Sequence, residues 1–212
     1  MNTILPSPLR PPLRREQIID RLQEPVVDEF DAPRGDHDLN PGLRAKKPLT
    51  PAAVLIGLIE HPTTTNVLLT LRTDHLYNHP GQISFPGGGT EPEDASAEET
   101  ALRETEEETG LQRHHIDIIG RLDDYETRTG FRITPIIAMI TPPFELSPDP
   151  FEVAEVFEVP LDFLLDPANH ERHLRQFQGV EREYYAMPYG DYYIWGATAG
   201  MLMNLYQTLK PR

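Results

Sequence analysis

Apolar residues recur with two different periods along the chain, and these periods predict its elements. Runs rich in apolar and β-branched residues, bounded by turn-forming residues, indicate strands at 53–60, 67–72, 82–85, 116–126, 131–140, 153–159 and 184–187. Helical spacing indicates helices at 14–24, 95–109, 161–165 and 196–209. Because these helices do not alternate strictly with the strands, the pattern favours an α+β fold with a mixed sheet over a doubly wound fold.

The first 49 residues differ in pattern from the rest of the chain. Residues 1–12 are rich in proline, residues 14–24 form the predicted short helix, and residues 25–48 show little periodicity. We therefore expect an N-terminal extension at 1–49, with a mobile tip, the helix and an extended arm over the surface, followed by one domain at 50–212. Three roles stay open for the arm: it covers an edge strand, exchanges with a second subunit of a homodimer, or remains mobile.

Composition excludes several classes of function. The 212 residues carry a net charge of −15, which excludes diffuse binding to nucleic acid or to an anionic membrane. The lack of cysteine excludes disulfides, thiolate metal sites and cysteine nucleophiles. The longest apolar run, 52–59, is too short to span a bilayer, and the N-terminus lacks the apolar run of a signal peptide. We therefore expect a soluble cytoplasmic protein.

The negative charge is concentrated between Gly88 and Gly110. This segment holds nine acidic residues and one arginine, so it carries −8 of the total −15. On the predicted helix, Glu104, Glu107 and Glu108 follow the spacing i, i+3, i+4 and share one face. A solvated helix face is the simplest explanation of an acidic cluster. Like charges at this spacing repel, however, so three clustered carboxylates favour a hard cation such as Mg²⁺ or Mn²⁺.

Two neighbouring features suit a site for metal ions and phosphate. Three glycines at 87–89 follow a predicted strand and allow close backbone approach, which offers a carbonyl ligand or amides for a phosphate. A plain tight turn needs the same residues. Arg103 precedes Glu104 and lies one turn before Glu107, where its guanidinium can orient a carboxylate. An ordinary surface ion pair has the same spacing.

The same residues resemble a family signature. Gly88, Asp94 and the run RETEEETGL at 103–111 are similar to the signature of the Nudix hydrolases, with two departures. Asp94 replaces the usual glutamate with one extra residue before Arg103, and Thr105 takes an aliphatic position. The resemblance extends over residues 50–209 and implies an α/β/α sandwich with a mixed sheet between helices. It further implies roles for these residues: catalytic Arg103, Glu104, Glu107 and Glu108, with the three glutamates and the Gly88 carbonyl as metal ligands and Arg103 as their orienting partner.

A second motif resembles the coenzyme A diphosphatase branch of this family. It consists of LLTLR at 68–72 and of Gly81 followed by FPGG at 85–88, with Tyr77 in place of an arginine. This resemblance implies metal-dependent hydrolysis of coenzyme A or its thioesters to 4′-phosphopantetheine, or its acyl form, and adenosine 3′,5′-bisphosphate. The water is activated by the ions, and no protein nucleophile is needed. Two alternatives stay open: a Nudix diphosphatase acting on ADP-ribose, NADH or another nucleoside diphosphate derivative, and a non-catalytic nucleotide-binding regulator.

The remaining candidates concern substrate binding and the general base. The substrate-binding candidates are Arg72, His79, Gly87 and Arg128, followed by Arg132. A surface arginine or a structural histidine explains several of these equally well. Glu152 and Glu155 are candidates for an extra acid or base, although a charge pair at a strand end explains them slightly better. We expect the tyrosines at 184–193 and Trp195 to pack in the core rather than stack a base.

Overall fold

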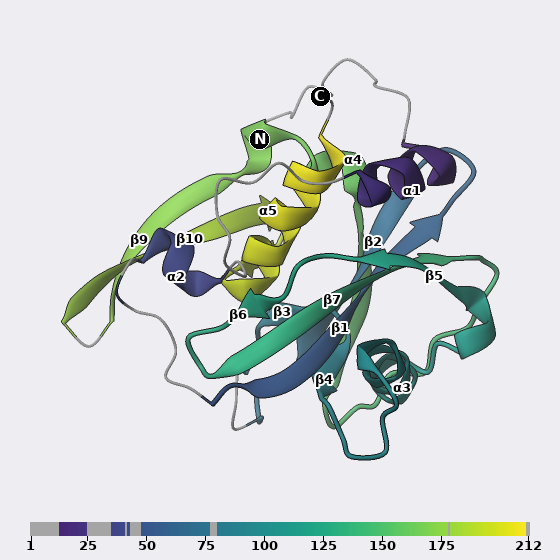
Figure 1. The fold of residues 1–212 in the computed structure, drawn as a ribbon, viewed down its shortest axis with the longest axis horizontal. Coiled ribbons are helices and arrows are strands. Elements are labelled where there is room, and N and C mark those ends of the chain that lie inside the picture. Colours follow the sequence, from purple (N-terminus) through teal and green to yellow (C-terminus); the bar gives the residue numbers. More distant parts are fainter. Residues whose placement is uncertain are drawn as a thin grey trace.

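Helices cover both faces of a mixed sheet in this protein (Figure 1). The computed structural model describes residues 13–24, 35–40, 42, 48–76, 80–177 and 179–210. Within them, eight strands form the mixed sheet and three more form a separate antiparallel sheet. The expected α+β sandwich with a mixed sheet between helices is therefore confirmed. In the described part of the chain, no helix is long and apolar enough to cross a membrane.

The strand β1 (Thr50–Glu60) lies at the centre of the large sheet. The other strands of this sheet are β2 (Thr65–Arg72), β3 (Ile83–Ser84), β4 (Gly87–Gly89), β5 (Ile116–Arg121), β6 (Tyr125–Glu126), β7 (Phe131–Ile140) and β8 (Val153–Pro160). β1 runs parallel to β7 and antiparallel to β2 and β4. β7 in turn pairs with β5 and β6, and β2 pairs with β3 and β8. Among the described strands, β1 and β7 are the one parallel pair, and this pair makes the sheet mixed.

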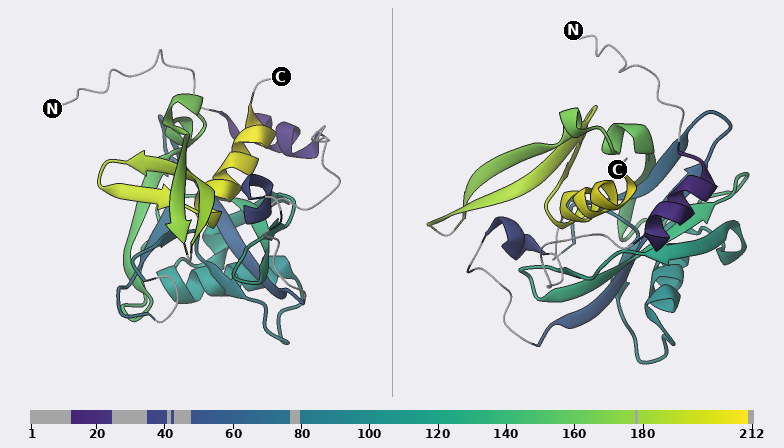
Figure 2. Two further views of the ribbon diagram at one scale, coloured as in Figure 1. Left: turned by 90° about the vertical axis from the view of Figure 1, so that its left-hand side faces the viewer. Right: turned by 45° about the horizontal axis from the view of Figure 1, so that its top comes forward.

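Two helical layers bury the two faces of this sheet. The helices are α1 (Arg15–Gln23), α2 (Asp36–Leu39), α3 (Ala97–Thr109), α4 (Leu161–Leu164) and α5 (Ala197–Leu209), with 3₁₀ turns at Arg113–His115 and Pro167–Asn169. Helix α3 packs on one face through Ala101, against Ala53 and Leu55. Helix α1 lies beside α5 on the other face (Figure 2), where Ile18 and Leu205 belong to the main core.

The smaller sheet consists of β9 (Glu171–Phe177), β10 (Val180–Tyr189) and β11 (Tyr192–Trp195). Only 184–187 of it follows from the hydrophobic pattern, because its outer positions are polar. The chain passes from β11 into α5, and the Thr198 hydroxyl near the start of α5 donates to the Ile83 carbonyl at 2.9 Å. Helix α2 contacts both β10 and β6. The N-terminal extension therefore touches both sheets.

The structure corrects three local predictions. The glycine run 87–89, expected as a loop, forms β4, and at Gly87 a Cβ would collide with Ala53 and Val54 of β1. The predicted strand 116–126 is interrupted after Arg121, where Pro135 on the facing strand offers a carbonyl to Leu122 but has no N–H to donate. The extended arm predicted at 25–48 contains the helical turn α2 within its described residues.

Candidate active site

Helix α3 carries the acidic cluster, and its ends are fixed by local sequence. The Ser96 side chain accepts the Glu99 N–H at 3.3 Å, and the chain leaves the helix at Gly110 with φ of 73°. Ala101 and Thr105 are fully buried against the sheet. This packing turns Glu104 and Glu108 toward β4.

The backbone of β4 lies directly against two carboxylates of α3. The Gly87 N–H donates to Glu108 Oε2 at 3.2 Å. A Cβ added at Gly88 would lie 2.5 Å from the Glu104 carboxylate carbon, whereas one at Gly89 would meet nothing within 4 Å. Only a glycine at position 88 therefore leaves room for the Glu104 carboxylate. We call this space the Gly88 cradle.

Arg103 connects this cradle to the loop before the helix. Its Nε and Nη2 each donate to Asp94 at 3.0 Å, and Nη2 also donates to the Gly89 carbonyl at 3.1 Å. Its Nη1 reaches Glu104 Oε1 at 2.9 Å and Glu107 Oε2 at 3.1 Å. The hydrogen bonds from Arg103 hold the pKa of Asp94 well below its usual range. Sequence reasoning left Asp94 without a role, and the structure gives it one as the anchor of Arg103.

Glu108 is a buried carboxylate with limited compensation. Its side chain is 4% exposed, and Arg72 Nη1 lies 3.5 Å from its Oε1. Burial raises the pKa of Glu108 to about 8, although Arg72 and the Gly87 N–H act in the opposite direction. Burial also raises the pKa of Glu104, against the effect of Arg103. Both groups sit where an added positive charge would stabilise their ionised forms.

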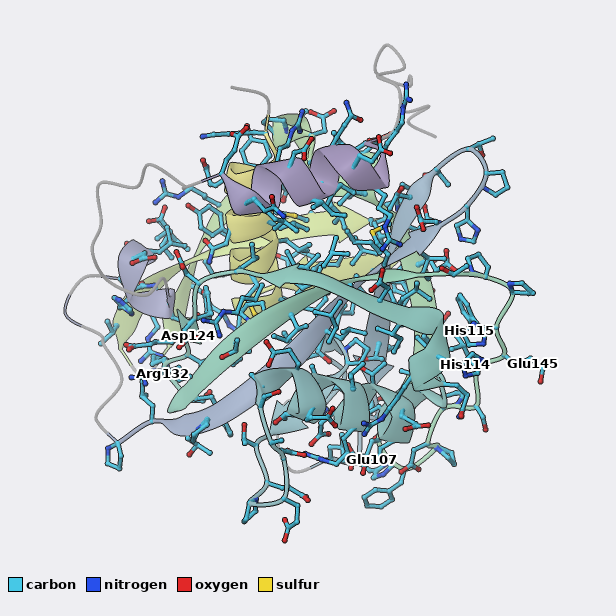
Figure 3. The ribbon with its side chains drawn as sticks, turned by 45° about the vertical axis from the view of Figure 1, so that its right-hand side comes forward. Glu107, His114, His115, Asp124, Arg132 and Glu145 are labelled. Carbon is cyan, nitrogen blue, oxygen red and sulfur yellow. The ribbon has the colours of Figure 1, made fainter. Side chains whose placement is uncertain are left out.

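The third glutamate of the cluster is placed differently. Glu107 is 60% exposed and lies on the side of α3 that faces away from the strands (Figure 3). Among the described residues, no three histidine or acidic side chains converge as a ready cation cage. The Arg103 guanidinium bonds to both Glu104 and Glu107, so it already supplies positive charge between these two carboxylates. The donors themselves are all oxygens, and with the Gly88 cradle they fit a hard divalent cation.

A cavity of about 930 Å³ opens beside these carboxylates. Glu104, Glu108 and Glu152 line it together with Gly87–Gly89 and Arg72. The charge of Glu152 adds to burial in raising the pKa values of Glu104 and Glu108, so the three carboxylates form one electrostatic group. Of the two candidates for an extra acid or base, Glu152 thus lies at the cavity. Glu155 does not line it and accepts a hydrogen bond from the Tyr192 hydroxyl at 2.7 Å.

The remaining substrate-binding candidates fall in different places. Arg128 lines the cavity, and its backbone N–H donates to Asp36 Oδ2 at 2.9 Å. Arg132 does not line it and lies 3.9 Å from the buried Glu126 carboxylate. Asp124 and Arg132 lie at the edge of the molecule, away from Glu107 (Figure 3). His79 lies outside the described residues, as does Tyr77.

Helix α2 and the three-stranded sheet lie on the side of the molecule away from α3 (Figure 1). Sequence reasoning missed that they form part of the cavity wall, which we call the far wall. It is formed by α2 and the three-stranded sheet, and it contributes Asp36, Asn40, Arg175, Arg182, Tyr184 and Trp195. Tyr184, Tyr185 and Trp195 thus line the cavity, against the expectation of core packing, whereas Tyr189 and Tyr192 do pack against the core. The sequence offered one signal for this wall. Side chains alternate between the two faces of a strand, so Arg182 and Tyr184 share one face.

Comparison with known proteins identifies the family. The model of the NUDIX domain matches residues 48–178. The chain belongs to the Nudix family. The matched segment contains α3, β4 and the cavity's acidic part, whereas α1, α2, β10, β11 and α5 lie outside it. The Nudix chain is also similar to proteins named as the uncharacterized Nudix hydrolase NudL. That of Yersinia enterocolitica is 38% identical over 75% of this chain and 81% of its own length. That of Pectobacterium atrosepticum is 36% identical over 82% and 90%.

Solved structures of Nudix proteins overlap with this chain in part. A MutT/nudix family protein from Enterococcus faecalis has a TM-score of 0.49 and 17% identity, over 76% of this chain and 61% of that one. The NUDIX domain of Shewanella oneidensis NrtR, complexed with ADP ribose, has a TM-score of 0.41 and 20% identity, over 57% and 78%. Overlaps of this size leave the substrate open.

Family membership establishes the reaction class. The chain is a Nudix hydrolase, a pyrophosphohydrolase that acts on a nucleoside diphosphate derivative. Members of this family generally use divalent metal ions, and the all-oxygen donor set beside Gly88 suits such an ion.

Proposed function

We propose that this Nudix hydrolase cleaves the pyrophosphate bond of coenzyme A or its thioesters, giving 4′-phosphopantetheine, or its acyl form, and adenosine 3′,5′-bisphosphate. The observation that carries the proposal is how the two halves of the second motif meet. The Arg72 N–H donates to the Gln82 carbonyl at 2.9 Å, and the Arg72 guanidinium lies 3.5 Å from Glu108 on α3. The residues that resemble the coenzyme A diphosphatase branch thus pack together beside the acidic cluster.

In this proposal Glu104, Glu108 and the Gly88 carbonyl would hold Mg²⁺ or Mn²⁺, and Glu107 would join them by turning its exposed side chain from Arg103 toward the cavity. Bound there, such ions would supply neutralisation of the diphosphate charge and a lowered pKa of the attacking water. The oxygen-only donors and the absence of cysteine favour these two metals over zinc.

The chain's own residues bind, orient and accept protons. Arg103, fixed by Asp94, holds the Glu104 carboxylate in place. Arg72 and Arg128 line the cavity and supply positive charge for a polyanion approaching a chain of net charge −15. Glu152 is the candidate general base or additional ligand, because it lies at the cavity with Glu104 and Glu108. No protein nucleophile takes part.

Product analysis tests this proposal. The protein is incubated with Mg²⁺ or Mn²⁺ and with coenzyme A, acetyl-coenzyme A, ADP-ribose or NADH, and the products are resolved by mass. We expect 4′-phosphopantetheine and adenosine 3′,5′-bisphosphate from coenzyme A. Cleavage of ADP-ribose or NADH without turnover of coenzyme A would contradict the substrate assignment and favour the broader diphosphatase. Turnover of none of the four would favour the non-catalytic regulator.

A pair of matched variants tests the metal site. Glu108→Gln should abolish hydrolysis and leave the circular dichroism spectrum unchanged, since it removes a charged ligand and keeps the shape. The control is Glu106→Gln on the same helix, because Glu106 bonds to Arg113 at 3.2 Å and does not line the cavity. Full activity of the Glu108→Gln variant would exclude the proposed metal site.

A further inference from the structure

Two arginines lie side by side on neighbouring strands of the small sheet, in the far wall. Arg175 of β9 and Arg182 of β10 are paired residues of the antiparallel register, and both line the cavity. Like charges directly opposite one another on a sheet are destabilising. Arg128 lines the same cavity, and the pKa of Arg182 is lowered by burial and, to a smaller extent, by the charge of Arg128. Three arginines therefore line this part of the cavity wall, where their charges favour an anion.

The acidic side chains of the same region have partners of their own. Asp36 accepts the Tyr125 hydroxyl and the Arg128 backbone N–H, each at 2.9 Å. Glu183 accepts Arg172 Nη2 at 2.6 Å. Among the described residues the far wall and its adjoining turn thus hold three arginines and two engaged carboxylates, whereas the α3 end holds three glutamates and one arginine. The lining of the cavity is therefore mainly acidic at the α3 end and mainly basic at the far wall.

Aromatic rings stand next to the arginine pair. Tyr184 follows Arg182 by two residues on β10, so the two side chains share one face of the sheet. The Trp195 ring lies edge-on to Tyr184 with centroids 5.4 Å apart, and both rings line the cavity. Aromatic surface beside arginines is the combination that receives a base and its phosphate.

We propose that Arg175, Arg182 and Arg128 bind a phosphate monoester on the nucleoside part of the substrate, and that Tyr184 and Trp195 form the wall against which the base stacks. This inference rests on the proposed function, because coenzyme A carries such a monoester on its adenosine in addition to the diphosphate. Paired guanidinium groups match the several acceptor oxygens of a phosphate dianion. The small sheet then selects substrates by a group remote from the bond that breaks.

Kinetics with two substrates that differ only in the monoester test the subsite. The substrates are coenzyme A and 3′-dephospho-coenzyme A, and the variant is Arg175→Gln/Arg182→Gln. We expect kcat/KM for coenzyme A to fall about 10- to 100-fold through KM, the range for charged hydrogen bonds, with less than about threefold change for the dephospho substrate. Equal losses for both substrates, or no loss for coenzyme A, would overturn the subsite.

Arg113→Gln is the matched control, because Arg113 lies after α3, is absent from the cavity wall and pairs with Glu99 and Glu106, which do not line the cavity either. It should leave the preference for coenzyme A unchanged. The melting temperature of the double variant is measured beside that of the wild type. A lower melting temperature with loss of both activities would mean that the arginines serve the fold, which contradicts the subsite.

Direct binding separates this inference from the proposed hydrolysis. Calorimetry compares adenosine 3′,5′-bisphosphate with adenosine 5′-monophosphate. Tighter binding of the bisphosphate in the wild type but not in the double variant supports the subsite even if coenzyme A is not hydrolysed. Equal binding of the two nucleotides by the wild type would overturn it, even if coenzyme A is hydrolysed.

Discussion

Asp94 and Arg103 form a two-point ion pair in which Nε and Nη2 of the guanidinium each lie 3.0 Å from a carboxylate oxygen. The Asp94 carboxylate also accepts the Thr100 hydroxyl and the Glu91 N–H, both at 2.9 Å, and its side chain is 6% exposed. Arg103 is therefore fixed from the loop before α3, and its Nη1 donates to both Glu104 and Glu107.

The first prediction follows from this pair. Asp94→Asn keeps the shape of the side chain but loses its charge and one of the two acceptors. We expect kcat to fall about 10- to 100-fold, as for other residues that orient a metal ligand, with a smaller change in KM. Steady-state kinetics over a range of Mg²⁺ concentrations measure both. Glu91→Gln is the control, since its carboxylate is 59% exposed and 4.0 Å from Arg103. Wild-type kcat in the Asp94 variant would contradict the positioning role.

The second prediction concerns the glycine cradle. Gly88→Ala places a methyl group 2.5 Å from the Glu104 carboxylate carbon, so the carboxylate must move. The group displaced is the end of a flexible side chain, and we therefore expect a large loss of activity with little change in melting temperature. Gly89→Ala is the neighbouring control, because its added methyl group meets nothing within 4 Å. Equal activity of the two variants would contradict the cradle.

The third prediction concerns the pH dependence of stability in the metal-free protein. Burial raises the pKa of Glu108 from an ordinary 4.5 to about 8 in the folded state. The folded state therefore binds this proton more tightly than the unfolded state does. Protonation of Glu108 therefore stabilises the folded state, and this contribution is complete below the unfolded pKa. It is lost as pH rises from about 4.5 to about 8, at no more than about 1.4 kcal/mol per pH unit.

Urea unfolding in the presence of a chelator measures this slope across that window. Other groups titrate there too, so the informative quantity is the difference in unfolding free energy between wild type and Glu108→Gln. We expect the wild type to lose stability relative to the variant as pH rises. Glu106→Gln should follow the wild type. A difference that stays constant with pH would show that Glu108 is already ionised when folded.

The fourth prediction concerns the attachment of α2 to the far wall. The Asn40 amide donates to the Glu183 carbonyl at 2.9 Å and to the Asp36 carbonyl at 3.0 Å, and its oxygen accepts the Glu183 N–H at 2.9 Å. Asn40→Asp replaces the donor by an oxygen that faces two carbonyls. We expect a loss of about 1–3 kcal/mol in stability and a higher KM, because α2 forms part of the cavity wall.

A matched change elsewhere distinguishes the two effects of this variant. Asn169→Asp removes one amide donor to the Phe163 carbonyl, bonded at 2.9 Å, at a site that does not line the cavity. It should lower stability without changing KM. If Asn40→Asp lowers stability but leaves KM unchanged, α2 is only a structural support.

Several elements follow from the sequence because their causes are local. Ser96 and Gly110 directly flank α3 and define its two ends, and the acidic residues of the cluster are at most four positions apart within it. The apolar strands β1 and β7 were recognised for a similar reason, since each is a run of buried residues in which the composition alone indicates a strand. The two family motifs were also readable, because each is nearly contiguous.

The sequence by itself therefore determined the fold class, the acidic helix and the reaction class. The tertiary structure decided which partners the site residues take: Asp94 for Arg103, Arg72 for Glu108, and Asn40 for Glu183, which lies 143 residues away. It also decided that a turn of the N-terminal extension and a late three-stranded sheet close one cavity. The physical reason is that these contacts depend on how sheets and helices pack in space. The residue spacing and composition near either partner carry no information on that packing.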